Sequence, residues 1–403
     1  MAFSISQFDK IIDRTQTWSL KWDPDYMKER FNRTDLLPFN HAEMDFECPK
    51  PVINAIKRRA SHGIYGYTLV KDEYYNCIVD WFNKRHSISY KREDLQFGTG
   101  IISSYRTIIN HFTIPKDNVL ILTPIYRPFI EGVEEYGRKV VRVPLFLEND
   151  KYLINFDLLE RIFEKKKIKM LALCNPHNPV GRVWNERELR KLGDLCVSHN
   201  TLIVSDDIHS DLTAKDHAYV PITSISEDIS NITITLTSPS KTFNLSGLKI
   251  SNYHITNPEI RNRFYPIIDK KFVYAPNVFA ITALMVAYTE CEEYANLLTQ
   301  YLDENYSYIE NYIIQNDLKI KVIKREGTPT IWLDFREIGI PHDKIFSFLL
   351  DQANLISVDG QFYGDEGFGF QRLSIGLPRS IVQKAMQNLR IASDSLNAIS
   401  NRN

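Results

Sequence analysis

The sequence contains little of what several classes of protein require. It has five cysteines in 403 residues and no CxxC pair, which argues against a disulfide framework and a cysteine-ligated zinc site. It has no excess of either charge, since 49 Lys and Arg residues stand against 50 Asp and Glu residues. A nucleic-acid-binding surface would need a basic stripe, so that class of function is not expected.

Long apolar runs are also missing. No segment reaches the roughly 18 uninterrupted apolar residues of a membrane-spanning helix. The first residues, MAFSISQFDKIIDR, carry charges and lack the apolar core of a signal peptide. No internal repeat or low-complexity stretch is visible, and the composition is 43% hydrophobic and 25% charged. This balance is typical of a soluble globular protein, and we expect a cytoplasmic one.

What is present is an alternation of short apolar strands with helix-length amphipathic segments. Several strands are continuous apolar runs, as expected when helices cover both faces of a parallel sheet. The order predicts an α/β fold with a mostly parallel sheet. The predicted strands are 95–100, 118–124, 140–145, 168–176, 201–207 and 231–240, and the predicted helices are 51–61, 72–86, 102–112, 127–137, 156–166 and 185–199.

The pattern changes after about residue 285. Residues 318–335 read as paired strands around Gly327, followed by a helix at 342–354, a strand at 370–376 and a last helix at 379–398. These elements predict a smaller α+β domain. We therefore expect an irregular, aromatic-rich arm at 1–48 that is part of the small domain, a large α/β domain at 49–285 and a small C-terminal domain at 286–403.

Polar residues interrupt the chain at four successive strand ends. These are GTG at 98–100, NPHNPVG at 175–181, SDDIH at 205–209 and SPSKTFN at 238–244. Ligands of an open parallel sheet bind beyond the carboxyl ends of its strands, so we expect these side chains to meet.

The groups at these ends match the needs of pyridoxal phosphate (PLP). Its aldehyde requires a lysine, and Lys241 is the candidate. Its pyridine nitrogen stays protonated when a carboxylate lies beside it, and Asp206 is the candidate for that role. Asn178 would face the phenolate oxygen. The phosphate would take N–H groups at a helix N-terminus and hydroxyl donors, from Gly100, Ile101, Ser238 and Ser240.

NPHNPVG, SDDIH and SPSKTFNLSG together resemble the fold-type-I, class I and II aminotransferase family, over about residues 40 to 390. YGYT (65–68), NPHNPVGRVW, the histidine of DDIH, SKTFNLSGLK and YGDEGFGFQRLSIGLPR (363–379) resemble its MalY/PatB branch. Members of that branch are typically cystathionine β-lyases or cysteine-S-conjugate β-lyases. The resemblance therefore implies a PLP enzyme with a large PLP-binding domain and a smaller one.

The resemblance also implies roles for single residues. Lys241 would hold the cofactor as a Schiff base and then remove the Cα proton, with Asp206 at the ring nitrogen. Tyr126 would stack on the ring, and His209 would join Asn178 at the phenolate oxygen. The remaining implied contacts are Tyr67 with the phosphate of the neighbouring subunit of a homodimer, and Arg372 with the substrate carboxylate through a bidentate pair.

Two positions depart from the pattern of the branch. A stretch commonly reading W-V-A-D-M-D-F is N-H-A-E-M-D-F at 40–46, and this strip, with Ala42, walls the substrate pocket. Lys249 lies eight residues after Lys241, where many aminotransferases have a phosphate-binding arginine. It would meet the phosphate as a point charge, or lie at the surface.

Other interpretations remain open at this stage. Asp206 would otherwise be a helix N-cap, Asn178 a turn residue, His209 a core histidine and Arg372 a strand-edge cation. Lys241 would otherwise be a surface residue, and Tyr67 and Tyr126 packing aromatics. Cofactor contacts serve both β-elimination, which releases a thiol, pyruvate and ammonia, and transamination of an aromatic or neutral amino acid. The branch resemblance favours the lyase, and a ligand-sensing module is a third reading.

Overall fold

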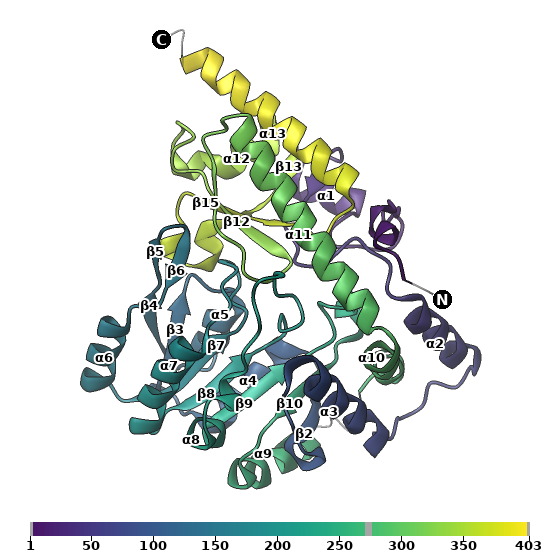
Figure 1. The fold of residues 1–403 in the computed structure, drawn as a ribbon, viewed down its shortest axis with the longest axis vertical. Helices are drawn as coiled ribbons and strands as arrows, with labels where there is room; N and C mark the ends of the chain where they lie inside the picture. The colour runs from purple at the N-terminus through teal and green to yellow at the C-terminus, as the bar shows by residue number, and fades with distance from the viewer. Residues whose placement is uncertain (1–2, 271–275, 401–403) are drawn as a thin grey trace.

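The computed structural model describes residues 3–270 and 276–400 (Figure 1). A seven-stranded sheet occupies one part, with strand order β2-β10-β9-β8-β7-β3-β4. All of its strands run parallel except β10, which is antiparallel to both neighbours. The strands are β2 (Leu95–Gly98), β3 (Asn118–Thr123), β4 (Lys139–Pro144), β7 (Ile168–Cys174), β8 (Leu202–Asp206), β9 (Thr233–Thr237) and β10 (Ser251–His254).

The continuous apolar runs are explained by burial on both faces of this sheet. Leu120 and Leu122 of β3 pack in one cluster with α6 (Phe156–Lys165) and α7 (Glu186–Ser198). Val119 and Ile121 of the same strand pack in another cluster with α4 (Ile101–Phe112), α5 (Pro128–Glu134) and α9 (Pro258–Lys270). Because successive side chains point to opposite faces, both positions must be apolar.

The remaining helices of this part are α2 (Lys50–Ser61), α3 (Asp72–His86), α8 (Glu227–Asn231) and α10 (Val278–Glu290), and a hairpin of β5 (Phe146–Glu148) and β6 (Lys151–Leu153) follows β4. The start of α7 follows local capping chemistry: the side chain of Asn185 accepts from the N–H of Glu188, and the side chain of Glu188 accepts from the N–H of Asn185. The predicted strands and helices of this region are present, within a few residues at their ends.

A second, antiparallel sheet lies above the first in Figure 1, with strand order β11-β12-β15-β14. The predicted pair around Gly327 is confirmed as β11 (Lys321–Val322) and β12 (Thr330–Asp334). Helices α11 (Glu292–Gln315) and α13 (Arg379–Ser400) lie side by side against it. The other elements are α12 (Ile345–Gln352), β13 (Leu355–Ile356), β14 (Val358–Asp359) and β15 (Phe370–Ser374).

The N-terminal segment joins this second part. Strand β1 (Leu37–Pro38) pairs in parallel with β13. The expectation that residues 1–48 are wholly irregular is wrong, because α1 (Pro24–Phe31) forms there, with the side chain of Asp23 capping its first turn. The division into domains at 48 and 285 stays a prediction. Within the described ranges, no helix is both long and apolar enough to cross a membrane.

Candidate active site

A cavity of about 930 Å³ lies where the carboxyl ends of β7, β8 and β9 face the second sheet. Of the residues predicted for the site, Tyr67 alone is absent from its lining, since that side chain is fully exposed on the single chain. The structure brings the others together around one space: Ala42, Gly100, Ile101, Tyr126, Asn178, Asp206, His209, Ser238, Ser240, Lys241, Lys249 and Arg372. Their convergence is what the positions of the strand ends predict.

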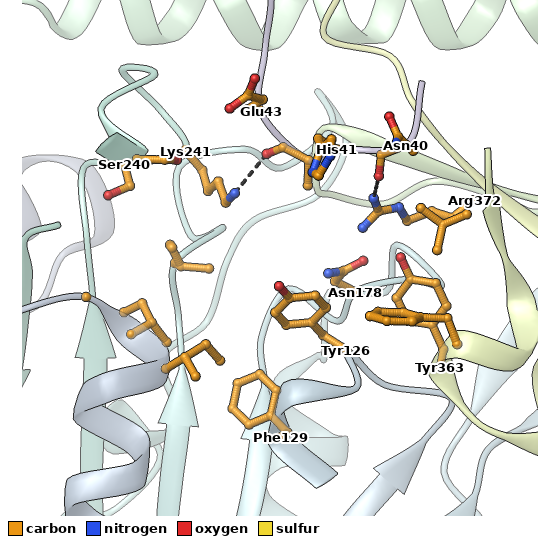
Figure 2. A pocket seen from close by; sticks show the side chains of 18 of the residues that line it. Asn40, His41, Glu43, Tyr126, Phe129, Asn178, Ser240, Lys241, Tyr363 and Arg372 are labelled. Atoms are coloured by element: carbon orange, nitrogen blue, oxygen red, sulfur yellow. Dashed lines mark hydrogen bonds between the residues drawn. The ribbon is translucent and has the colours of Figure 1, made fainter. Parts of the chain in front are cut away.

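Lys241 follows β9 in a turn and points into the cavity (Figure 2). Its Nζ donates to the carbonyl oxygen of Ala42 at 2.9 Å. Burial lowers its pKa to about 8, and the positive charge of Arg372 acts in the same direction, while Glu43 and Asp206 oppose the shift. A neutral amine, which is the nucleophilic form, is therefore accessible near neutral pH.

Asp206 is the last residue of β8 and is buried. Its Oδ1 accepts from the N–H of Ile208 at 3.1 Å. Burial raises its pKa to about 7, and the neighbouring Asp207 adds to that effect. No helix starts at this point, since residues 208–211 form turns, so the N-cap interpretation is wrong. A buried carboxyl of this kind becomes a stable anion when a cationic N–H lies against it.

Several buried polar atoms at the cavity have no hydrogen-bond partner among the described residues. Two of them are Oδ1 of Asn178 and Nδ1 of His209. Burial lowers the pKa of His209 to about 3, so its ring is neutral. Buried polar groups are almost always paired, and two such atoms at one cavity indicate a place for a polar ligand. The residues present thus fit the polar edge of the predicted cofactor.

The N-terminus of α4 supplies the anion-binding end of the cavity. Gly100 is its N-cap, with φ 107° and ψ 153°, and no side chain caps the helix. The N–H of Gly100 donates to Oγ of Ser251 at 3.0 Å, so the first unpaired helix donor is that of Ile101. Ser238 and Ser240 lie within 2.6 Å of each other through their hydroxyl oxygens, and Lys249 is an exposed cation on the same cavity. This set suits a phosphate.

Arg372 enters the cavity from β15, opposite Lys241 (Figure 2). One of its terminal nitrogens donates to the carbonyl oxygen of Asn40, and its Nε has no partner among the described residues. Its guanidinium carbon lies 5.5 Å from the ring centre of Tyr363. Tyr126, directly beyond β3, lies between the two cations in the view of Figure 2. An anion held by Arg372 would therefore lie across the cavity from the lysine.

The N-terminal segment supplies more of the cavity than the sequence predicted. Asn40, His41 and Glu43 line the cavity, as expected of the strip at 40–46, and so do residues of α1. No role was predicted for His41 or for α1. Phe129 and Tyr363 also line the cavity and are buried aromatics, which no local pattern separates from core residues.

The sequence model of the family described as "Aminotransferase class I and II" matches residues 34–389. The chain is 34% identical over 385 residues to "Cystathionine beta-lyase PatB" of Bacillus subtilis (strain 168), covering 96% of this chain and 99% of that protein. It is 31% identical over 384 residues to "Protein MalY" of Escherichia coli (strain K12), covering 95% and 97%. The crystal structure of cystalysin from Treponema denticola, which contains a pyridoxal 5'-phosphate cofactor, matches with a TM-score of 0.93 and 31% identity, covering 98% and 100%.

These matches confirm the predicted resemblance to the MalY/PatB branch and the predicted fold class. They extend over nearly the whole chain, and the chain shares its overall fold with cystalysin. The chain belongs to the class I and II aminotransferase family.

Proposed function

We propose that the protein is a PLP-dependent carbon–sulfur β-lyase, which cleaves sulfur amino acids of the cystathionine or cysteine-S-conjugate type to a thiol, pyruvate and ammonia. The observation that carries the PLP-dependent part of the proposal is the meeting of Lys241, Asp206 and Arg372 around one cavity. The choice of β-elimination is supported by the 34% identical relative that is named a cystathionine beta-lyase.

The cofactor residues of the proposal are those predicted from the sequence. Asp206 would hold a proton on the ring nitrogen. Asn178 would donate to the phenolate oxygen through its amide N–H, and His209 through a ring N–H at Nδ1, which has no partner among the described residues. Ile101, Ser238, Ser240 and Lys249 would bind the phosphate, beside the backbone of Gly100. When bound, the cofactor would accept the electrons left on Cα as its proton is removed.

The other steps belong to the side chains of the chain itself. Arg372 would bind the α-carboxylate, and its free Nε leaves a second donor for a bidentate pair. Tyr126 would pack over the ring. The Nζ of Lys241, freed by the substrate amine, would take the Cα proton, because its lowered pKa makes it a base suited to neutral pH. Elimination follows when Cβ carries a thiolate leaving group.

The rival function is an aminotransferase for an aromatic or neutral amino acid. We would incubate the pure holoenzyme with L-cystathionine or an S-alkyl-cysteine without any 2-oxo acid. Release of thiol and pyruvate in equal amounts supports the lyase. Turnover only after a 2-oxo acid is added would contradict the proposal and identify an aminotransferase. No turnover with either, while the yellow cofactor stays bound, would favour a sensor.

The proposal includes a homodimer in the cytoplasm. The segment at 64–70 leaves Ile64, Tyr65, Tyr67 and Leu69 exposed, which is the kind of apolar surface that a second copy covers. In such a dimer Tyr67 would reach the phosphate of the neighbouring site. The five cysteines are all free thiols, as a reducing compartment maintains them.

A further inference from the structure

A histidine that belongs to none of the cofactor contacts lies at the centre of the substrate side of the cavity. His41 lines the cavity, and the residues on either side of it bind the two cations. The carbonyl oxygen of Asn40 accepts from Arg372, and that of Ala42 accepts from Nζ of Lys241. Figure 2 shows the His41 side chain between Lys241 and Arg372. Across the described ranges, no residue forms a hydrogen bond with its ring.

The electrostatic surroundings keep this ring neutral. Burial lowers the pKa of His41 below its ordinary value, and the positive charges of Lys21, Arg372 and Lys241 act in the same direction. The negative charge of Glu43 opposes the shift. A neutral imidazole carries one N–H donor and one acceptor nitrogen. Such a ring is able to accept a proton on one side and deliver another from the opposite side without holding a net charge.

The positions of Arg372 and Lys241 define where a substrate would lie. A carboxylate on Arg372 and a Cα–H bond facing Nζ of Lys241 leave the Cβ–S bond in the space between them, which His41 lines. We propose that His41 relays a proton from Lys241 to the sulfur atom that leaves the substrate. This inference rests on the proposed lyase function and adds to it a catalytic residue.

The step balances without a further reactant. Lys241 takes the proton from Cα, and the electron pair of that C–H bond forms the second bond between Cα and Cβ. The Cβ–S bond breaks, and its electron pair leaves with sulfur. The ammonium of Lys241 then gives a proton to the acceptor nitrogen of His41, while the other ring nitrogen gives its proton to sulfur. The products of the relay are a thiol, a neutral Lys241 and a neutral His41 in its other tautomer.

The relay matters most for leaving groups that are poor anions. An aryl thiolate leaves readily without a proton, whereas an alkyl thiolate, whose conjugate acid has a pKa of about 8.5 or above, benefits from protonation as it departs. Positioned proton transfer contributes about 10² to 10⁴ in rate. Loss of His41 should therefore slow S-alkyl substrates and spare S-aryl substrates, a pattern that a merely structural role would not produce.

The test is a series of S-substituted cysteines, from S-alkyl to S-nitroaryl, assayed with the holoenzyme. Wild type is compared with His41→Gln and His41→Val, and with His199→Gln, which removes an exposed histidine at the end of α7. We expect the His41 variants to lose about 10- to 100-fold in kcat/KM for S-alkyl-cysteine and less than about 3-fold for the nitroaryl substrate. The His199 variant should match wild type throughout.

Two further results, rescue by imidazole and the pattern of losses across the substrates, decide the outcome. Added imidazole should restore part of the S-alkyl activity of His41→Val, because it replaces the missing relay. Equal losses for all substrates in both His41 variants, or no loss in either, would overturn the relay while leaving the lyase function intact. Absence of thiol release by the wild type would instead overturn the proposed function itself, so the two failures are distinguishable.

Discussion

The pKa values of Lys241 and Asp206, the two groups that define the site, are both shifted toward neutral pH, one from above and one from below. Burial lowers the pKa of Lys241 to about 8 and raises that of Asp206 to about 7. Each shift reflects the cost of a charge away from water, and each is reduced by the opposite charge of the other residue. The pair is thus prepared for a ligand that removes one charge by covalent capture and stabilises the other with a cationic ring N–H.

The lysine gives the first prediction. Adding PLP to the cofactor-free wild type should form a borohydride-reducible bond, at a rate that rises with pH through about 8, because only the neutral amine attacks an aldehyde. Lys241→Ala should form no such bond and lose about 10²- to 10⁴-fold in kcat. Lys249→Ala is the control and should keep the bond with weaker affinity. A reducible bond retained in Lys241→Ala would contradict the assignment.

The carboxylate of Asp206 gives a prediction about how stability depends on pH. Its pKa rises from an ordinary 3.8 to about 7 on folding, so the folded chain binds more protons between these values. The free energy of unfolding therefore falls as the pH rises through this range. In the cofactor-free protein, Asp206→Asn should be more heat-stable than wild type by a margin that is small near pH 4 and full above about pH 7.

Thermal unfolding across that pH range checks the margin, with Asp365→Asn as control because the Asp365 side chain is almost fully exposed. In the holoenzyme the same Asp206→Asn change should lower kcat/KM by about 10²-fold, since it removes the anion beside the ring nitrogen. A margin that does not change with pH would show that Asp206 carries no ionisation cost in the folded chain.

At the residue level, the sequence was sufficient to predict the cofactor contacts and Arg372, but it was insufficient to predict a role for His41. Lys241, Asp206 and Asn178 follow strands that apolar runs reveal, so their convergence could be predicted from order alone. His41 and Asn40 come from a strip without regular structure, about 200 residues before Lys241. Only the fold brings that strip against the sheet, where Asn40 and Ala42 bond Arg372 and Lys241.

At the scale of elements, the N-terminus of α4 depends on one backbone conformation. With φ 107° and ψ 153°, Gly100 occupies a region that is open essentially only to glycine. An added Cβ meets nothing nearer than Oγ of Ser103 at 3.8 Å, so the cost of a side chain is conformational and not steric crowding.

Gly100→Ala should therefore cost about 1–3 kcal/mol or displace the turn that begins α4. We expect the dissociation constant of PLP to rise about tenfold, measured by titration of the cofactor-free protein. Gly247→Ala is the matched control, because its Cβ would meet nothing within 4 Å and its φ lies outside the strained region. Equal affinities for the two variants would mean that this turn does not hold the phosphate.

Two elements that sequence reasoning did not find, β10 and α10, lack the residue patterns by which strands and surface helices are recognised. Strand β10 reads Ser-Asn-Tyr-His, without an apolar run, yet all four residues are buried. Its polar side chains each make a hydrogen bond instead: Asn252 accepts from Tyr74 at 2.6 Å, and His254 bonds Thr237 at 2.7 Å. Helix α10 is apolar on all sides and packs against α2 and α3, so it lacks the one-sided pattern of a surface helix.

At the scale of the whole molecule, the cavity has three walls from distant parts of the chain. The seven-stranded sheet supplies the cofactor groups, β15 supplies Arg372, and the 40–46 strip closes the space between them. Asp45, which belongs to this strip, holds it in place: its carboxylate accepts from Lys21 and from the indole of Trp22, both at 2.9 Å. A buried carboxylate paired in this way ties the N-terminal segment to the site.

A fourth wall would come from a second copy of the chain. Tyr67 is fully exposed, and Ile64 and Leu69 beside it are 68% and 76% exposed. These are large apolar side chains on one short segment, next to Tyr65, which packs on Phe279 of α10. A dimer that covers this segment would have two sites, each completed by the Tyr67 of the partner chain, as a closed twofold arrangement requires.

Mixing two inactive variants tests this directly. In heterodimers of Lys241→Ala with Tyr67→Ala, one site has both an intact lysine from its own chain and an intact tyrosine from the other. Random exchange of equal amounts should therefore restore about a quarter of the wild-type activity per chain. Lys241→Ala mixed with Asp206→Asn should restore none, because both residues serve their own chain. Monomers by light scattering, or no restoration in the first mixture, would place Tyr67 outside the site.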